Sequence, residues 1–404
     1  MTDLTQFDSM RSLEPTTDAR WVGVGHSTDP DALAAGRTAA REALNGDDAK
    51  LLVVFCSDSY DLEQLLAGIT ELAGDTPLIG CSTAGEIAPG GPATSSVVVT
   101  AFGGPGFSAR TAAAANASTR LREAGEELAA ALADHEDDCE HRVAILLSDA
   151  LGGDQTQVIR GAYSVLGATV PLVGGCAGDD FKLTATVQFY NGEVRNDTLV
   201  GAVLASDAPL GVGVRHGWRR VGEPVLVTRS ANNRVYELDD RPALDVYLER
   251  FNAPEAAYTD PTAFAQFSMT HPLGLGRRSA EEGARFVAEA NFEDRSLGMI
   301  AEVPQGGLAW FLEGDVDSVL EATDDACRDA IDALDGSEPI GLLAFDCAAR
   351  RLVLGDEGLE QEVDRILAHA DGAPVAGFYS YGEIARIRGA SGFNNETLVV
   401  LAVS

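Results

Sequence analysis

The sequence predicts an α/β protein with mostly parallel sheet, built from repeated strand–helix–strand–helix–strand–strand units and divided into two domains. Three observations predict this fold. The chain has 404 residues, too many for one hydrophobic core of ordinary size. Short apolar runs alternate with amphipathic segments of roughly 10 to 20 residues, a pattern typical of βα units. One order of segments occurs three times along the chain, which indicates an internal repeat.

The first two copies of the repeat follow a polar segment at residues 1–19, which we expect to be a flexible tail. The first copy reads as strand, helix, strand, helix, glycine-broken strand and closing strand at residues 21–27, 27–44, 51–58, 61–74, 77–87 and 95–102. The second copy has the same order at residues 106–113, 118–133, 142–149, 154–167, 171–180 and 197–206. Several strands are continuous apolar runs, as in sheets that are covered on both faces.

The third copy is separated from the first two by a segment of different character. Its elements are expected at residues 307–315, 316–334, 339–346, 360–372, 374–384 and 394–403. The intervening segment has short alternating strands and one helix, at residues 211–218, 224–230, 234–240 and 241–251. We therefore expect an N-terminal domain at residues 20–212 with two copies, and a C-terminal domain at residues 213–404. The C-terminal domain would contain a β-rich insertion at residues 213–306 and the third copy.

The composition predicts a strongly acidic surface. The chain has 63 acidic and 29 basic residues and a formal net charge of −34, which repels nucleic acid and anionic lipid. Apolar residues make up 45% of the chain, too many for a disordered acidic segment. Neither a membrane-spanning run nor a signal peptide is recognisable. The sequence thus predicts a cytoplasmic protein of a high-salt cell, with no nucleic-acid partner and no membrane insertion.

The residues that usually carry catalysis or bind metals are scattered. The six cysteines are far apart without a CxxC pair, and the six histidines form no cluster, so neither a zinc site nor a disulfide framework is predicted. Phosphate-binding motifs such as GxGxxG after a strand or GxxxxGK[ST] are missing as well. We expect no cofactor, no metal and no enzyme activity.

Each copy carries glycines followed by an acid where its third strand ends. These residues are Gly80, Gly85 and Glu86, then Gly174, Gly175, Gly178 and Asp179, and finally Gly377, Gly382 and Glu383. Asp58, Asp149 and Asp346 end the preceding strands. Ligands of α/β sheets bind outside the carboxyl ends of strands, so these carboxylates could share one edge. Alternatively, the glycines form tight turns and the acids cap the next element.

The same segments resemble the signature stretches of the FIST family, in a haloarchaeal type. They are residues 80–87, 174–180 leading to 187–194, 345–351 and 377–403, and the resemblance spans about residue 20 to the C-terminus. It implies a FIST N-terminal and a FIST C-terminal domain and a sensory module of signal transduction. Such a module would bind a small ligand, for example an amino acid, and would act on a signalling protein in trans, because no kinase, cyclase or chemoreceptor domain is recognisable here.

The resemblance also implies which positions bind the ligand. They are Cys81, Ser82, Gly85, Glu86, Gly175, Gly178, Asp179, Asp180, Tyr379, Tyr381, Glu383, Asn394 and Asn395. Asn394 stands where a histidine is expected in the family's terminal motif. For an amino-acid ligand, Glu86 and Glu383 could hold the ammonium group, while loop N–H groups, a helix N-terminus or Arg386 could hold the carboxylate.

Two other functions remain open at this stage. Cys81 and Cys176 resemble the paired cysteines of cofactor-independent amino-acid racemases, which act as acid and base on a substrate carbon. However, the repeat aligns Cys81 with Gly175 and Cys176 with Ser82, and each cysteine could simply be a small buried apolar residue. A structural or scaffold role is the third alternative.

Overall fold

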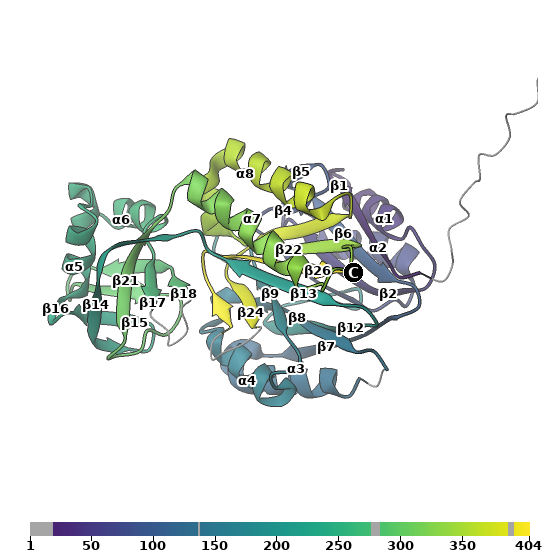
Figure 1. Cartoon of the computed structure of the whole chain (residues 1–404), viewed down its shortest axis with the longest axis horizontal. Helices are drawn as coiled ribbons and strands as arrows, with labels where there is room; N and C mark the ends of the chain where they lie inside the picture. Colours follow the sequence, from purple (N-terminus) through teal and green to yellow (C-terminus); the bar gives the residue numbers. More distant parts are fainter. Residues whose placement is uncertain (1–18, 136–137, 276–282, 387–391) are drawn as a thin grey trace, which may run out of the picture.

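The computed structural model describes residues 19–135, 138–275, 283–386 and 392–404. Residues 1–18 of the expected tail therefore lie outside the described part of the chain. The protein is a mixed α/β fold in which three α/β units form one body and a β-rich lobe extends from it (Figure 1). We call the units unit 1, unit 2 and unit 3, in chain order, and the β-rich part, residues 216–314, the inserted lobe.

Units 1 and 2 follow the order of elements that the repeat predicts. Unit 1 comprises β1 (Trp21–Ser27), α1 (Ala32–Ala43), β2 (Ala49–Cys56), α2 (Leu62–Ala73), β3 (Leu78–Ser82), β4 (Glu86–Ala88), β5 (Gly91–Ala93) and β6 (Val97–Gly103). Unit 2 comprises β7 (Phe107–Ala115), α3 (Leu121–Ala133), β8 (His141–Asp149), α4 (Thr156–Leu166), β9 (Leu172–Ala177), β10 (Gln188–Tyr190), β11 (Glu193–Arg195) and β12 (Thr198–Ser206).

Unit 3 has the same order, but the inserted lobe interrupts it after its first strand. It comprises β13 (Leu210–Arg215), α7 (Val316–Asp332), β22 (Gly341–Cys347), α8 (Ala348–Ala370), β23 (Val375–Ser380), β24 (Glu383–Arg386), β25 (Phe393–Asn394) and β26 (Leu398–Val403). Gly355 interrupts α8 with a positive φ of 60°.

The three units share one strand order, and it corrects the expectation of mostly parallel sheet. The orders are β1-β6-β2-β3, β7-β12-β8-β9 and β13-β26-β22-β23. Among the described strands, only β2–β3, β8–β9 and β22–β23 pair in parallel; the sheets are largely antiparallel. The helical connection does orient β1 and β2 the same way, but the closing strand β6 lies between them and is antiparallel to both.

Each unit also contributes a short hairpin to the sheet of another unit. The hairpin β4–β5 of unit 1 pairs with β23 of unit 3. The hairpin β10–β11 of unit 2 pairs with β3 of unit 1, and β24–β25 of unit 3 pairs with β9 of unit 2. This exchange closes a ring of three units. The glycine-acid segments, which lead into the hairpins, are thereby brought together.

The inner faces of the three sheets enclose one common core. Phe55 of unit 1 packs against Phe345 and Phe378 of unit 3, with ring centroids 6.1 and 4.5 Å apart, and the inner strand residues of unit 2 belong to the same cluster. The outer faces are covered by the helix pairs α1–α2, α3–α4 and α7–α8, each with an apolar cluster of its own. The body is thus built in two layers, with the sheets inside and the helices outside (Figure 1).

The inserted lobe has a sheet and a core separate from those of the body. It comprises β14 (Arg219–Ala231), β15 (Arg234–Leu238), β16 (Arg241–Pro242), α5 (Ala243–Arg250), α6 (Pro261–Ser268), β17 (Leu273–Leu275), β18 (Gly283–Arg285), β19 (Val287–Asn291), β20 (Ser296–Met299) and β21 (Leu308–Glu313). Tyr247 and Phe311 lie at the centre of its apolar cluster.

Two strands belong to other sheets than the sequence suggested. The strand expected to open the third copy is β21, which pairs with β14 and β17 of the lobe. The strand at residues 211–218, expected in the insertion, begins with β13, which pairs with β26 and opens unit 3. Both assignments were wrong because a short apolar strand does not by itself reveal its partner. That choice depends on pairing with a distant segment.

Candidate functional site

The three glycine-acid segments interlock at the centre of the ring. The N–H groups of Gly178 and Asp180 donate to the carbonyls of Ser82 and Thr83, at 2.9 and 3.1 Å. Tyr379 exchanges two backbone hydrogen bonds with residues 84 and 85, and Cys176 exchanges two with residues 381 and 382. At Gly178 a Cβ atom would crowd the backbone nitrogen of Ala84, at 2.6 Å. The segments therefore lie together, and Gly178 permits the close approach.

Glu86 and Glu383 occupy equivalent positions and are fully buried. Glu86 accepts hydrogen bonds from the hydroxyls of Thr83 and Ser96. Glu383 accepts from Ser380 at 2.7 Å and from the Thr397 hydroxyl at 2.9 Å. Burial raises the pKa of each carboxyl to about 7, against the opposing effect of the hydroxyl donors. Both oxygens of each acid are therefore occupied by neighbouring groups.

The acids of unit 2 organise a loop instead. Asp179 accepts from the backbone N–H groups of residues 183–185 and from the Tyr381 hydroxyl, at 2.7 Å. Burial opposes its ionisation, but these donors outweigh burial and lower the pKa of Asp179. Asp180 has a positive φ of 50° and accepts from Ser57 of unit 1, at 2.8 Å. Tyr381 thus links unit 3 to unit 2, and Asp180 links unit 2 to unit 1.

The two cysteines of the racemase alternative are both fully buried. Cys81 faces the common core, whereas Cys176 belongs to the apolar cluster under α3 and α4. Burial raises the pKa of both thiols, so the reactive thiolate is disfavoured. The parallel pairing also aligns Cys81 with Gly175, and Ser82 with Cys176, as the repeat predicts. This geometry gives no support to paired acid–base chemistry by these cysteines.

Ser82 and Gly175 contact neighbouring units at this point of the ring. The Ser82 hydroxyl accepts from the backbone N–H of Val187, at 3.1 Å, and so fixes β10 beside β3. A Cβ atom on Gly175 would crowd the side chains of Phe378 and Ser380. Gly85 has a positive φ of 114°. These residues position the strand exchange.

The inserted lobe meets the body at the loop before the last strand, residues 392–397, which we call the terminal loop. The Trp218 indole donates to the carbonyl of Glu396 at 2.9 Å, and Arg285 donates to the carbonyl of Phe393 at 3.2 Å. Asn394 pairs with Glu383 across β24 and β25. Three residues of the predicted site, Glu383, Asn394 and Asn395, therefore lie at the junction between the lobe and unit 3.

A buried charge network lies beside the terminal loop, and of its members the sequence had singled out only Asp346. The Arg350 guanidinium is fully buried and donates to Asp346 and Glu362, both at 2.6 Å, and to Thr323 at 2.9 Å. Burial raises the pKa of Asp346 despite the neighbouring Arg350. The sequence offered one signal for this network, because Asp346 and Arg350 stand four residues apart at the start of a helix.

Asn395 and Glu396 are the most unusual residues of the junction. Both are fully buried. In the described part of the chain, neither side-chain atom of the Asn395 amide and neither oxygen of the Glu396 carboxylate has a hydrogen-bond partner. Burial and the nearby Glu383 raise the pKa of Glu396, and Arg350 opposes them. Buried polar groups in proteins are nearly always paired, so these two residues indicate a missing partner.

Negative charge is in excess around this junction. Asp346, Glu362, Glu383 and Glu396 are fully buried, and Arg350 is the fully buried basic residue beside them. The second oxygens of Asp346 and Glu362 and the hydroxyl of Tyr379 also lack partners among the described residues. Isolated buried carboxylates are costly unless a proton or a cation compensates them. The arrangement can therefore hold protons or a positively charged group.

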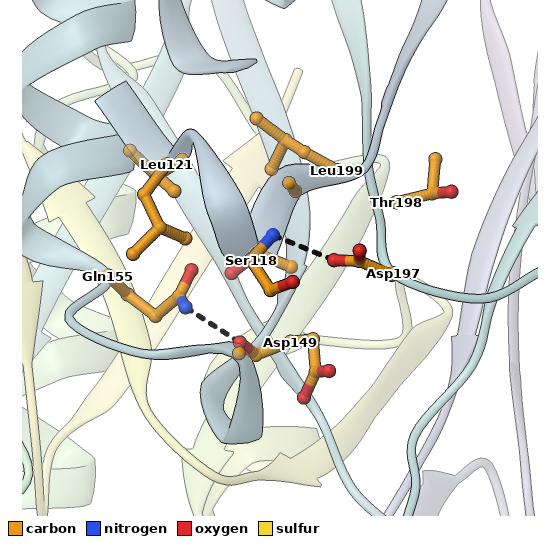
Figure 2. Close-up of a pocket in the computed structure, with 11 residues that line it drawn as sticks. Ser118, Leu121, Asp149, Gln155, Asp197, Thr198 and Leu199 are labelled. Carbon is orange, nitrogen blue, oxygen red and sulfur yellow. Dashed lines mark hydrogen bonds between the residues drawn. The ribbon is translucent and has the colours of Figure 1, made fainter. Parts of the chain in front are cut away.

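A second feature is a small open hollow in unit 2, which offers about 10 Å³ of space for the centres of water-sized molecules (Figure 2). It lies where β8 and β12 meet the starts of α3 and α4. Its lining residues are Ala117, Ser118, Leu121, Ser148, Asp149, Gly152, Gln155, Val158, Asp197, Thr198 and Leu199. Asp149 is one of the strand-end acids that the sequence singled out. Gln155 and Asp197 were not predicted.

Two absences characterise the described ranges, residues 19–135, 138–275, 283–386 and 392–404. No group of three or more His, Cys, Asp or Glu side chains in them is placed to hold a metal ion. No helix in the described part of the chain is both long and apolar enough to cross a membrane.

Comparison with known proteins gives relatives in archaea and bacteria. The chain is similar to an uncharacterized protein of Methanocaldococcus jannaschii, with 25% identity over 41% of this chain and 33% of that protein. The match therefore spans about a third of that relative's length. Two uncharacterized proteins of Mycobacterium tuberculosis, from strains CDC 1551 and H37Rv, are 26% identical over 91% of this chain and 95% of each relative.

Similarity to solved structures is slight. Cyanuric acid hydrolase from A. caulinodans has a TM-score of 0.26 and 12% identity, covering 46% of this chain and 71% of that chain. Phosphoribosylformylglycinamidine synthase II from Thermotoga maritima has a TM-score of 0.23 and 12% identity, covering 95% of this chain and 71% of that chain. Neither likeness carries an argument about fold or function.

Family models match nearly the whole chain. The FIST N domain matches residues 50–241 and the FIST C domain matches residues 243–386. The chain therefore belongs to the FIST family, whose domains are sensory domains of signal transduction that bind small ligands.

Proposed function

We propose that this protein senses a small ligand with a positively charged amino group, as in an amino acid, and binds it at the junction between the terminal loop and the inserted lobe. One observation carries the proposal. Asn395 and Glu396 are neighbours in the sequence, and both are fully buried. None of the polar atoms of their side chains has a hydrogen-bond partner among the described residues. A bound ligand is the kind of partner that would satisfy them.

The chemistry of the junction favours an ammonium group. Such a group donates several hydrogen bonds and carries one positive charge, which matches an unpaired carboxylate. The Asn395 amide could accept from the ammonium group and donate to a ligand carboxylate. Arg386, considered for the carboxylate, instead lies over the ring of Tyr163. Successive side chains of a strand point to opposite faces. Arg386 stands three residues after Glu383 on β24, so the two side chains lie on opposite faces of that strand.

The position of this site supports a sensory role. The terminal loop belongs to unit 3, and Trp218 and Arg285 contact it from the inserted lobe. A ligand between these parts would contact both and would stabilise one arrangement of the lobe on the body. A signalling protein that binds the lobe or the body in trans could then distinguish the two states.

The proposal is tested by a thermal-shift screen of the common amino acids on the full chain in molar potassium chloride. A ligand that binds only the folded state stabilises it by about 2.7 kcal/mol at a hundredfold excess over Kd, so at least one hit is expected. Glu396→Gln should abolish that shift. The unliganded variant should melt at or above the wild-type temperature, because it removes an unpaired buried carboxylate.

Glu86→Gln is the matched control. Glu86 is as deeply buried as Glu396, but both of its oxygens have hydroxyl partners. This variant should keep the ligand shift. Amides of a hit, which retain the ammonium group, should still bind, whereas its N-acetyl derivative should not. A blank screen, or an equal loss of the shift in both variants, would contradict the proposed site.

A further inference from the structure

The position of Glu396 has a counterpart in every unit. The closing strands β6, β12 and β26 can be aligned through their pairing with β2, β8 and β22. In this alignment Val99, Gly201 and Val400 are equivalent. Four residues before these positions stand Ser95, Asp197 and Glu396, and all three have a positive φ, of 50°, 46° and 58°. The same backbone turn thus carries a carboxylate in units 2 and 3. In unit 2 this carboxylate lines the hollow of Figure 2.

The hollow contains a buried oxygen without a partner. Gln155 is 2% exposed, and its amide nitrogen donates to the carbonyls of Asp149 and Gly153, at 2.6 and 3.0 Å. These two bonds fix the orientation of the amide. Its oxygen is then turned toward Ser118 and Leu121 (Figure 2), and it has no hydrogen-bond partner in the described part of the chain. A buried carbonyl oxygen of this kind calls for a donor or a cation.

The two carboxylates at the hollow each have an oxygen to spare. One oxygen of Asp149 accepts from the Leu151 N–H at 2.8 Å, and one oxygen of Asp197 accepts from the Ser118 N–H at 2.7 Å. No bond is described for their second oxygens. The lining therefore offers carboxylate, amide and hydroxyl oxygens, which are the ligands that hard cations prefer.

The net charge of the lining favours a single positive charge. Asp149 and Asp197 contribute two negative charges. The starts of α3 and α4 adjoin the hollow through Leu121 and Gln155. Each helix N-terminus is equivalent to about +0.5 charge, so about one negative charge remains uncompensated. This balance suits a monovalent cation better than a divalent one.

Unit 1 shows that the fold does not require these polar groups. The pairing of β2 and β8 with their neighbours places Ser57 where unit 2 has Asp149. The two helices of each pair cross at a glycine, Gly68 in unit 1 and Gly161 in unit 2. Leu62 and Gln155 each stand six residues before that glycine, so they occupy equivalent positions. Unit 1 therefore has serine, leucine and serine where unit 2 has Asp149, Gln155 and Asp197.

We infer that the hollow formed by Asp149, Gln155 and Asp197 is a binding site for one monovalent cation, an ammonium or an alkali-metal ion. The oxygens of these three residues and of Ser118 surround the ion. The site is separate from the Glu396 junction, because it lies in another unit. The bound cation would stabilise the starts of α3 and α4 by joining them to the ends of β8 and β12.

The test is thermal unfolding of the full chain at constant molar ionic strength, with choline chloride replaced stepwise by ammonium, potassium or sodium chloride. Choline is too large for the hollow, so it controls for charge screening. We expect the wild-type Tm to rise by at least about 2 °C with the preferred cation, and the separate titrations identify which of the three it is.

Two variants of the hollow and two control variants assign that rise in Tm to the hollow. Asp149→Asn/Asp197→Asn should remove it. Glu357→Gln/Glu360→Gln, which removes the same charge from the exposed face of α8, should keep it. Gln155→Leu introduces the residue of unit 1 without changing charge and should weaken it. Glu396→Gln should keep it, so the outcome does not depend on the proposed function.

Equal Tm values for choline and all three small cations would overturn the inference and leave the hollow to water. A rise that persists in Asp149→Asn/Asp197→Asn and in Gln155→Leu would overturn it as well, because the cation would then act elsewhere.

Discussion

Glu86→Gln should uncouple part of the stability of this protein from pH. In the folded protein, burial raises the pKa of Glu86 from its ordinary value of 4.5 to about 7. A carboxyl group of this kind contributes its full stability below pH 4.5, and that contribution is lost as the pH rises through about 7. Glutamine imitates the protonated acid and does not ionise.

The magnitude follows from the shift in pKa. Each pKa unit corresponds to about 1.4 kcal/mol, so ionised Glu86 makes the native state less stable by about 3 kcal/mol above pH 7 than protonated Glu86 would. Both partners of Glu86 are hydroxyls, which can accept as well as donate. Glutamine should therefore fit with little cost at acid pH.

The assay is urea unfolding of wild type and Glu86→Gln in molar salt over a pH series from about 4.5 to about 9. The difference in unfolding free energy should increase by about 3 kcal/mol in favour of the variant from the acid to the alkaline end. Glu357→Gln, on the exposed face of α8, should give a flat difference. A flat difference for Glu86→Gln as well would refute the reasoning, because Glu86 would then titrate alike in both states.

Three further outcomes are expected. Arg350→Met should lower the unfolding free energy by about 3 to 5 kcal/mol in urea titrations, because it leaves Asp346 and Glu362 buried without a counter-charge; Arg160→Met, at an exposed ion pair, should change it little. Gly68→Ala should cost about 1 to 3 kcal/mol in the same titrations, since its Cβ would overlap a carbonyl oxygen of α1, whereas Gly90→Ala meets open space. The Tm should rise as potassium chloride increases from millimolar to molar, because salt screens the net charge of −34; an unchanged Tm would contradict salt adaptation.

The candidate site was predictable only in part. Sequence patterns identified the glycine-acid segments, because glycine turns and acids at strand ends are local features, whereas the family resemblance added Asn394 and Asn395. They gave no reason to prefer Glu396 over Glu86 or Glu383. What distinguishes Glu396 is the lack of a partner for its buried oxygens, and that depends on the inserted lobe and on residues distant in sequence. Gln155 and Asp197 were missed for the same reason.

By itself, the sequence determined the α/β class, the threefold repeat and most of the helices and strands of the body. These follow from periodicity, apolar runs and turn residues, which act over a few positions. A local signal for the opening of unit 3 was also present, since Gly211 and Gly213 repeat the spacing of Gly23 and Gly25, and all four lie against helix carbonyls.

The tertiary structure alone decided the direction of the sheets, the exchange of hairpins and the location of the junction. A closing strand that lies between two parallel ones changes most pairings to antiparallel without altering any local pattern. Hairpin exchange likewise joins segments that are far apart in the chain. Strand partners are selected by burying side chains of distant segments together, so short-range patterns predict the strands but not their neighbours.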